Sequence, residues 1–315
     1  LPVNVRILVE GEEEIGGESV VEWVRDDSEG VDCAVVFDAG MLNETTPSIT
    51  LGVRGHIGFD ISIRTAESNL HSGLYGGSVV NAAHVMHRIL AEVMPGPDGR
   101  LREELRVGIV PPTQAELDSW AMLPPGDDVL AEVGAMPLTP RSGAEYYVRN
   151  WADASLDIAG VSGGDAFQIR TIVPSTATAT FNMRLAPGQR TAEILPVLKR
   201  LVMDAVPPGV EITDIKTRRG EAALFSATEP AIVLAAEALH EATGVKPAFV
   251  RSGGSIPILA AFADRGIPTI LSGFGLPQDR IHAPDESFRV KSLELAERSA
   301  RALYSSLSRL EVGTR

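Results

Sequence analysis

Residues 56–64 read His-Ile-Gly-Phe-Asp-Ile-Ser-Ile-Arg, and this stretch decides the fold class. Its large apolar residues stand at every second position from Ile57 to Ile63, which predicts a strand with one buried and one solvated face. Residues 177–185 repeat this period of two. A helix over 78–94, apolar along one face, separates the two stretches. This part of the chain is therefore expected to form an α+β domain with an antiparallel sheet.

Outside this block the apolar residues form short continuous runs. Residues 31–38 (VDCAVVFD) and 267–271 read as strands covered on both faces, which is typical of an α/β sheet. Residues 3–9 are also expected to form a strand, and helices are expected near 18–27, 229–243 and 290–310. Residues 95–175 are rich in Pro and Gly and are expected to hold only short helical pieces.

The fold class predicted from these patterns is α/β. A mixed sheet flanked by helices is split between residues 1–52 and 219–315, and an α+β domain is inserted at 53–218. A length of 315 residues agrees with about two domains of roughly 150 residues each.

Composition excludes several classes of protein. Hydrophobic residues make up 44% and charged residues 22%, so the chain is not intrinsically disordered. The net charge of −14 argues against nucleic acid or an anionic membrane as partner. Neither an apolar run of the ~18 residues that span a membrane nor a signal-peptide pattern is visible. Cys33 is the single cysteine, which excludes an intramolecular disulfide. A cytoplasmic location is expected.

The acidic stretch Glu10-Gly11-Glu12-Glu13-Glu14 stands between a predicted strand and a predicted helix. Carboxylates stabilise a helix N-terminus, which explains some of these residues. Ligand sites, however, concentrate at the carboxyl ends of strands in α/β sheets. Two consecutive carboxylates there can divide the work of binding a metal and accepting a proton. Asp38 ends another predicted strand, where it is either a turn former or a ligand.

Two of the six histidines are candidates for chemistry. His71 lies in the glycine-dense stretch 69–77, and His282 lies in the polar loop 280–286. The four others are less suitable: His84 and His87 fit surface positions, His240 fits a helix end, and His56 heads a strand with no obvious partner in the sequence.

Two further features suit an anionic ligand. The turn Ser252-Gly253-Gly254-Ser255-Ile256-Pro257 can offer free backbone N–H groups, although many glycine turns only permit tight packing. Arg184 falls on the polar face of its strand, as either a solvated surface residue or a bidentate carboxylate ligand. The turn lacks the Lys-Ser/Thr end of a P-loop, so a nucleotide-binding protein is disfavoured.

These motifs, taken in order, resemble the dinuclear metallopeptidases that include carnosinase-like dipeptidases, acetylornithine deacetylase and glutamate carboxypeptidase. Residues 10–17 look like the central acidic motif of that family, and 69–77 like its histidine loop. Residues 251–257 and the loop at His282 look like its C-terminal motifs. The resemblance covers essentially the whole chain and favours the dipeptidase branch.

The resemblance implies roles for nine residues. Glu13 would be the general base, while Glu14 and His282 would bind one metal ion and Asp38 the other. His71, reaching from the inserted domain of a second subunit, would polarise the scissile carbonyl. The C-terminal carboxylate of a peptide substrate would be held by Arg184, Ser255, Gly254 and Thr171. The inserted domain would be a lid and a homodimer interface, and the rest the catalytic domain.

The cofactors implied are two divalent ions, with zinc favoured over manganese or cobalt. The family places a His-x-Asp motif and a bridging Asp ahead of its acidic motif, and this chain opens without Met on the apolar run Leu1–Val9. We therefore expect a fragment that lacks the first His and Asp ligands and is inactive alone. Two alternatives stay open, an N-acyl amino acid deacylase and a non-catalytic dimerisation module.

Overall fold

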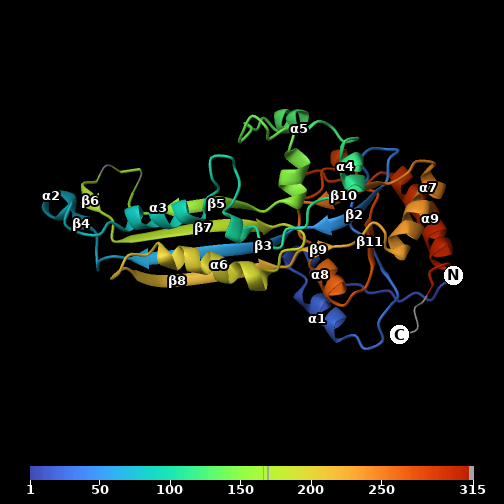
Figure 1. Ribbon diagram of the computed structural model, residues 1–315, viewed down its shortest axis with the longest axis horizontal. Coiled ribbons are helices and arrows are strands. Elements are labelled where there is room, and N and C mark those ends of the chain that lie inside the picture. The colour runs from blue at the N-terminus through green and yellow to red at the C-terminus, as the bar shows by residue number, and fades with distance from the viewer. Residues whose placement is uncertain (166, 169, 312–315) are drawn as a thin grey trace. The chain divides into compact units, whose positions relative to one another are not determined.

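The computed structural model describes residues 1–165, 167–168 and 170–311. The chain folds into two compact units, coloured by chain position in Figure 1. The first unit consists of Leu1–Val53, Pro111–Val129 and Ala223–Arg315, and the second of Arg54–Val110 and Leu130–Ala222. The chain therefore passes between the units four times. The fold is α/β, as predicted.

The first unit is built on a mixed sheet with the strand order β1-β11-β2-β10, with β9 paired to β2. β1 runs parallel to β11, and β10 parallel to β2, but β11 is antiparallel to β2. The strands are β1 (Ala34–Phe37), β2 (Ser48–Val53), β9 (Ala223–Leu224), β10 (Ala248–Ser252) and β11 (Thr269–Ser272). Every residue of β2 is buried, because β2 lies inside the sheet under helices.

Helices flank this sheet. The helical elements of the first unit are η1 (Glu13–Ile15), α1 (Glu18–Asp26), α4 (Gln114–Trp120), α7 (Pro230–Thr243), α8 (Pro257–Asp264), η4 (Pro277–Asp279) and α9 (Val290–Leu307). α1 packs against α8, and α7 against α9. The core joins strand residues such as Ile49 and Ile270 to helix residues such as Ile232 and Leu303. α5 (Gly126–Glu132) contains the point at which the chain passes to the second unit.

The segment 111–129 belongs to the first unit, whereas the sequence had placed it within the inserted domain 53–218. α4, in this segment, contacts β10 through side chains that a local sequence pattern does not reveal. The indole nitrogen of Trp120 donates a hydrogen bond of 3.1 Å to the Phe249 carbonyl. The second unit begins at Arg54 and ends at Ala222, whereas 53 and 218 were predicted from the sequence as the ends of the inserted domain.

The second unit contains a four-stranded antiparallel sheet in the order β5-β7-β3-β8. Its strands are β3 (Gly55–Arg64), β5 (Ser155–Ser162), β7 (Thr176–Leu185) and β8 (Glu211–Gly220), and a separate pair is formed by β4 (Leu70–His71) and β6 (Ile172–Val173). Its helical elements are α2 (Ser72–Tyr75), α3 (Ala82–Val93), η2 (Glu103–Leu105), the π-helical turn η3 (Val148–Ala152) and α6 (Thr191–Asp204).

The period of two places one face of this sheet in the core. Phe59 and Phe181 sit directly opposite on β3 and β7, with ring centroids 4.9 Å apart. α3 and α6 contact each other and cover this face, and Figure 1 shows both running along the strands. The polar residues between the apolar ones lie on the other face of the sheet. The predicted strands near 57–63 and 177–185 and the helix near 78–94 are thus confirmed as β3, β7 and α3.

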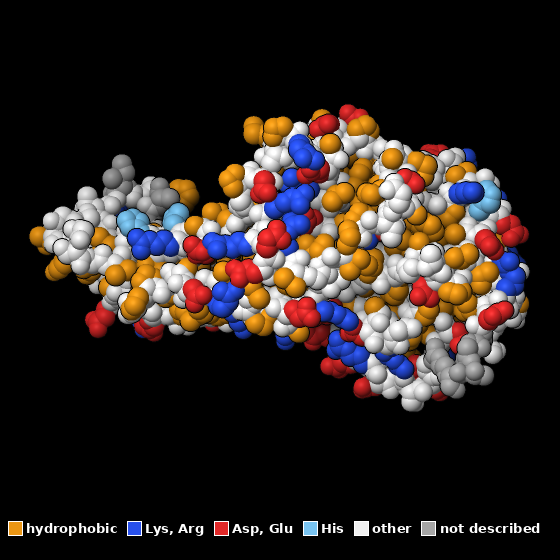
Figure 2. Space-filling model, in the orientation of Figure 1, with side chains coloured by type: hydrophobic (Ala, Val, Ile, Leu, Met, Phe, Trp, Pro, Cys, Tyr) orange, Lys and Arg blue, Asp and Glu red, His pale blue; other side chains and the backbone are white. Residues whose placement is uncertain are grey.

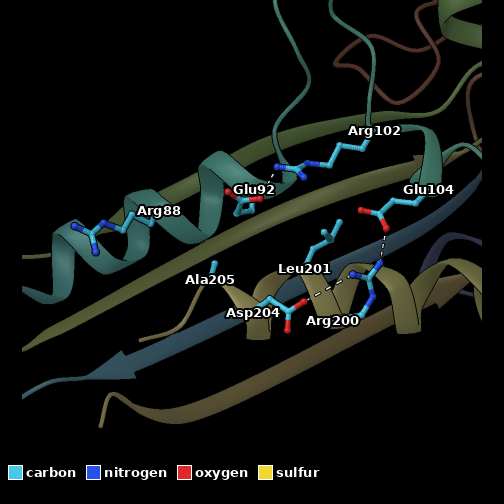
Figure 3. Close-up of a pocket in the computed structure, with 8 residues that line it drawn as sticks. All are labelled: Arg88, Glu92, Arg102, Glu104, Arg200, Leu201, Asp204 and Ala205. Carbon is cyan, nitrogen blue, oxygen red and sulfur yellow. Dashed lines mark hydrogen bonds and ion pairs between the residues drawn. The ribbon is translucent and has the colours of Figure 1, made fainter. Parts of the chain in front are cut away.

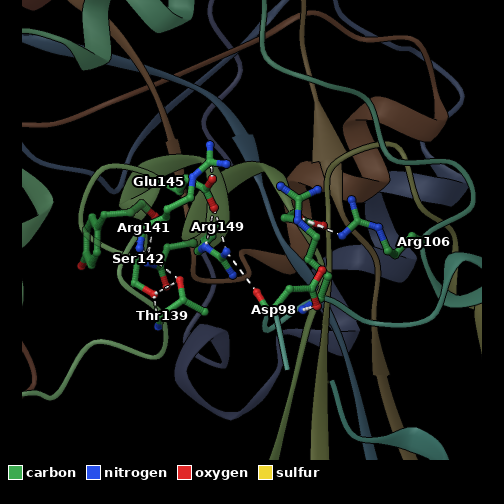
Figure 4. A network of polar contacts seen from close by, with 11 residues as sticks. Asp98, Arg106, Thr139, Arg141, Ser142, Glu145 and Arg149 are labelled. Carbon is green, nitrogen blue, oxygen red and sulfur yellow. Dashed lines mark hydrogen bonds and ion pairs between the residues drawn. The ribbon is translucent and has the colours of Figure 1, made fainter. Parts of the chain in front are cut away.

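A network of polar contacts joins the loop at Asp98 to the segment 139–149 of the second unit (Figure 4). Glu145 pairs with Arg149 at 2.7 Å and with Arg141 at 2.8 Å. Arg149 also donates a hydrogen bond of 3.2 Å to the Asp98 carbonyl, which ties two loops together. Ion pairs and hydrogen bonds therefore connect the loop at Asp98 to the segment 139–149 within this Pro- and Gly-rich region.

Two sequence predictions of secondary structure are wrong. Residues 3–9 form no strand, and the side chains of Ile7 and Val9 are 84% and 83% exposed. An apolar run becomes a strand only beside another strand, and none pairs with it among the residues that the structure describes. The stretch 95–175 holds β5 and β6 in addition to short helices. β5 carries a register shift between Ile158 and Gly160, and exposed residues hide its period.

Positively charged side chains lie beside negatively charged ones across the face drawn in Figure 2. No helix in the described part of the chain is long and apolar enough to span a membrane.

Candidate active site

A cavity of about 1240 Å³ lies within the first unit, at the ends of β1 and β11. It is lined by five of the residues selected from the sequence: Glu13, Glu14, Asp38, Ser255 and His282. Part of the cavity wall is apolar and is formed by Phe37, Ile281 and Phe288. Residues from four distant parts of the chain therefore meet here, at the sheet edge where ligand sites of α/β folds concentrate.

Glu13 and Glu14 stand on η1, a single 3-10 turn directly before α1. Gly16 and Gly17 follow with φ of 118° and 56°, values that favour glycine. These two left-handed residues turn the chain between η1 and α1. Both carboxylates consequently line the cavity instead of continuing along a helix face.

Asp38 follows β1 directly, and a close approach of two backbones sets its position. Gly40 bridges to Gly275 in the parallel direction. A Cβ on Gly273 would lie 1.7 Å from the Ala39 carbonyl oxygen, so only glycine fits at Gly273. This approach brings the segment after β11 beside the segment after β1. Gly273 was not among the residues predicted from the sequence, although its place after an apolar run and before Phe274-Gly275 was a usable signal.

His282 occupies a strained loop. Its φ is 61°, and Arg280 and Asp285 have φ of 57° and 63°. Three left-handed residues other than glycine in six positions cost free energy, and such strain concentrates at functional sites. The backbone N–H of His282 donates a hydrogen bond of 3.3 Å to the Glu286 carboxylate, which also lines the cavity. Glu286 was missed by the sequence analysis.

The imidazole Nε2 of His282 lies 3.0 Å from Oε1 of Glu14. These residues are 268 positions apart in the chain. Both side chains remain about 70% exposed, so the pair can still receive a ligand from the cavity. The predicted meeting of Glu14 with His282 is therefore present in the geometry.

Crowding of carboxylates changes the acidity of two groups. Loss of surrounding water raises the pKa of Glu13, and the negative charges of Asp38, Glu14 and Glu10 raise it further. The pKa of Asp38 is raised by the same loss of water and by Glu14. His282 opposes both shifts. A carboxylate with a raised pKa is a stronger base, which is the property required of a proton acceptor.

The donor types at the cavity fit a divalent ion, since carboxylate and imidazole are ligands of zinc, manganese and cobalt. Their number falls short of a full site. No group of three or more His, Cys, Asp or Glu side chains within the described ranges is arranged to hold a metal ion. Catalytic zinc usually has three protein ligands. The described residues thus supply part of a ligand set.

The turn after β10 carries Gly254 and Ser255. The Gly254 N–H donates a hydrogen bond of 3.1 Å to the Ser252 hydroxyl, which closes the turn. Ser255 and Ile256 line the cavity, and α8 begins at Pro257. A serine hydroxyl beside a helix start is a suitable donor to an anionic group.

The other predicted residues lie in the second unit. His71 and Thr171 are neighbours, because β4 pairs with β6 and the Ser72 N–H donates a hydrogen bond of 2.8 Å to the Thr171 carbonyl. The Gly73 N–H donates to Nδ1 of His71 at 3.1 Å. Nδ1 is then an acceptor, so the neutral ring carries its proton on Nε2, on an exposed side chain.

Arg184 stands on β7 opposite His56 of β3 and Ser155 of β5. Burial and then the charge of Arg184 lower the pKa of Arg54 to about 10, and the same causes lower the pKa of His56. Burial is the larger cause of both shifts, and the charge of Arg184 adds to it, so the guanidinium of Arg184 acts on both neighbouring side chains.

A second cavity, of about 510 Å³, lies in the second unit and holds none of the predicted residues (Figure 3). Arg102 pairs there with Glu92, and Arg200 with Glu104. Arg200 also lies 3.7 Å from Asp204. The paired opposite charges that line this cavity thus neutralise one another.

The sequence model described as Peptidase family M20/M25/M40 matches residues 1–306. The Cys-Gly metallodipeptidase DUG1 of Candida albicans is 23% identical over 302 residues, which cover 93% of this chain and 62% of that protein. The human Beta-Ala-His dipeptidase is 22% identical over 273 residues, or 84% of this chain and 54% of that protein. This chain thus spans little more than half the length of these relatives.

Solved structures agree on the fold. The M20 family metallo-carboxypeptidase Sso-CP2 from Sulfolobus solfataricus superposes with a TM-score of 0.80 at 20% identity, covering 96% of this chain and 70% of that chain. The di-peptidase Dug1p from Saccharomyces cerevisiae gives a TM-score of 0.74 at 22% identity, over 96% of this chain and 65% of that chain.

Proposed function

This chain belongs to Peptidase family M20/M25/M40, and from that premise we propose that it carries the catalytic centre of a metal-dependent dipeptidase. The proposed reaction is hydrolysis of the peptide bond in a dipeptide or short peptide with a free C-terminal carboxylate. The observation that carries the proposal is the convergence of Glu13, Glu14, Asp38 and His282 on one cavity, with Glu14 and His282 in contact at 3.0 Å.

In this proposal Glu13 is the general base. Its raised pKa suits it to accept a proton from the attacking water and to return that proton to the leaving amine. Glu14 and His282 would hold one divalent ion and Asp38 a second, with zinc favoured over manganese or cobalt. Such an ion would supply Lewis acidity at the scissile carbonyl. The described residues supply only part of the ligand set for such ions.

The remaining residues would bind and orient the substrate. Ser255 and Gly254 would donate to the C-terminal carboxylate from the turn after β10, and Arg184 and Thr171 would do so from a lid formed by the second unit. His71 of a partner subunit would donate its Nε2 proton to the carbonyl oxygen. We propose a homodimer formed through the lid. The cytoplasmic location stays a prediction from the sequence.

Metal binding and turnover, measured on the full-length protein that carries these residues, test this proposal together. We expect titration calorimetry with Zn²⁺ or Mn²⁺ to give binding that Glu14→Gln weakens. We expect Glu13→Gln to keep the binding but to lower kcat for Cys-Gly by about 100-fold or more. Glu18→Gln, in the first turn of α1 and outside the cavity lining, is the matched control.

Three outcomes separate the alternatives. Unchanged turnover in Glu13→Gln removes the role given to Glu13. Faster hydrolysis of N-acetyl amino acids than of dipeptides favours the deacylase. The shortage of metal donors among the described residues favours a third possibility, a non-catalytic dimerisation module. Absence of both metal binding and turnover would support that module and contradict the enzyme.

A further inference from the structure

One ion pair in the first unit is almost completely buried. Arg251 on β10 and Glu116 on α4 each retain 2% exposure. Nε of Arg251 lies 2.6 Å from Oε1 of Glu116, and Nη2 lies 3.1 Å from Oε2. The guanidinium therefore binds the carboxylate through two parallel hydrogen bonds, an arrangement that fixes direction as well as distance. Arg251 also donates to the Pro111 carbonyl at 3.3 Å.

Glu116 is itself held in place by its own helix. It closes a capping box with Thr113, whose backbone N–H donates a hydrogen bond of 2.7 Å to Oε2 of Glu116. The Glu116 N–H donates in return to the Thr113 hydroxyl at 3.3 Å. Such a reciprocal pair orients the carboxylate at the start of α4 before any contact with β10.

α4 also covers the outer edge of β10, the last strand in the sheet order. The Phe249 N–H donates a hydrogen bond of 3.2 Å to the Ser119 hydroxyl, and the Phe249 carbonyl accepts from the Trp120 indole at 3.1 Å. Both backbone groups would otherwise be unpaired, as on any edge strand. Three side chains of α4 thus hold β10 at its outer edge.

A buried ion pair is a poor way to gain stability, because desolvation of both charges offsets much of their attraction. An apolar pair would fill the same volume. What the ion pair adds is a single orientation for Arg251, and Arg251 is followed directly by the turn 252–256 that reaches the cavity.

We propose that Glu116 is a positioning residue that acts through Arg251 to fix the turn 252–256 and thereby the donors Gly254 and Ser255. This inference rests on the proposed function for the binding of substrate, but its structural part can be tested without any turnover. The segment 111–129, which the sequence had placed in the inserted domain, would then serve the site of the first unit.

Hydrogen exchange of the full chain, followed by mass spectrometry, tests the structural part. In Glu116→Gln we expect amides of 249–256 to exchange about tenfold faster, while amides of β11 in the same sheet stay unchanged. Asp118→Asn makes the same carboxylate-to-amide change on α4, at an exposed residue bonded only to Gln114 within the described contacts, and should change nothing. Ser119→Ala removes one bond to β10 and should give a smaller increase, of about threefold, even if Glu116→Gln fails to fold.

Kinetics test the functional part. We expect KM for Cys-Gly to rise about tenfold in Glu116→Gln with kcat changed by less than about twofold, since a displaced turn weakens binding without altering the base. Exchange that equals wild type, or that rises equally in β11, overturns the positioning role. Faster exchange with an unchanged KM overturns its link to substrate. Failure of wild type to hydrolyse Cys-Gly would count against the proposed function, and exchange would then decide the positioning role alone.

Discussion

The two units use charge in opposite ways. In the first unit several carboxylates line one cavity, and burial together with their like charges raises the pKa values of Glu13 and Asp38. In the second unit the cavity is lined by arginines and carboxylates, and its three carboxylates each pair with Arg102 or Arg200 (Figure 3). Paired surface charges serve solubility and local structure, whereas like charges held together cost free energy and mark a site for chemistry. The presence of charged side chains therefore does not identify a functional site, whereas a cluster of like charges without balancing opposite charges does.

Removing one arginine from each unit should give the largest contrast. Arg251→Ala leaves Glu116 charged and buried, so we expect the free energy of unfolding to fall by about 3–5 kcal/mol. Arg200→Ala breaks an exposed pair with Glu104 and should cost less than about 1 kcal/mol. Urea denaturation followed by fluorescence measures both values. Equal losses would show that burial does not separate the ion pairs of the two units.

The two units also differ in how closely other atoms pack against a glycine: Gly273 of the first unit is tightly enclosed, and Gly160 of the second is not. Gly273→Ala places a methyl group 1.7 Å from the Ala39 carbonyl oxygen, so the cavity wall must move, and we expect a loss of about 1–3 kcal/mol. A Cβ added to Gly160 on β5 would meet no atom within 4 Å, and Gly160→Ala should be close to neutral. Thermal unfolding of the two variants compares them. A neutral Gly273→Ala would mean that the approach of the two loops is not required.

The smallest expected effect is a pH dependence of the buried ion pair. Burial alone would raise the pKa of Glu116, but the bonds and charge of Arg251, together with Thr113, outweigh burial and lower it below the ordinary 4.5. The pair therefore contributes fully above the unfolded pKa, and its contribution is lost as pH falls through the folded pKa.

Wild type and Glu116→Gln should therefore differ by a constant free energy of unfolding above about pH 5.5. The difference should shrink as pH falls below about 4.5 and through the lowered pKa of folded Glu116. Urea denaturation across this range measures it. A difference that grows on acidification would reverse the sign assigned to Glu116.

Local patterns in the sequence predicted most of the elements. The period of two identified β3 and β7, and the continuous apolar run at 31–38 identified β1. Motif order also selected Glu13, Glu14, Asp38, Ser255 and His282, which the fold brings to one cavity. Elements were predicted where the information is carried by residue spacing within one element, and the chemical roles of these five residues stay predictions.

The failures have a common cause, which is dependence on distant partners. Ile7 and Val9 are apolar enough for a strand, but no described strand lies beside them. The role of Glu116 could not be predicted, because its contact with Arg251 spans 135 positions. Gly273 is required by Ala39, which lies more than 200 positions earlier. None of these contacts leaves a local periodicity in the sequence.

The connectivity of β2 has a consequence for the order of assembly during synthesis. β2 is fully buried, and each strand that pairs with it, β9, β10 and β11, begins at or after residue 223. At least 170 positions therefore separate β2 from its first partner. The second unit lies between these positions in the sequence. It can therefore be synthesised and fold before any described strand partner of β2 exists, and β2 is unpaired during this time. Contacts of such long sequence separation are slow to form, so this unpaired interval is where aggregation competes with folding.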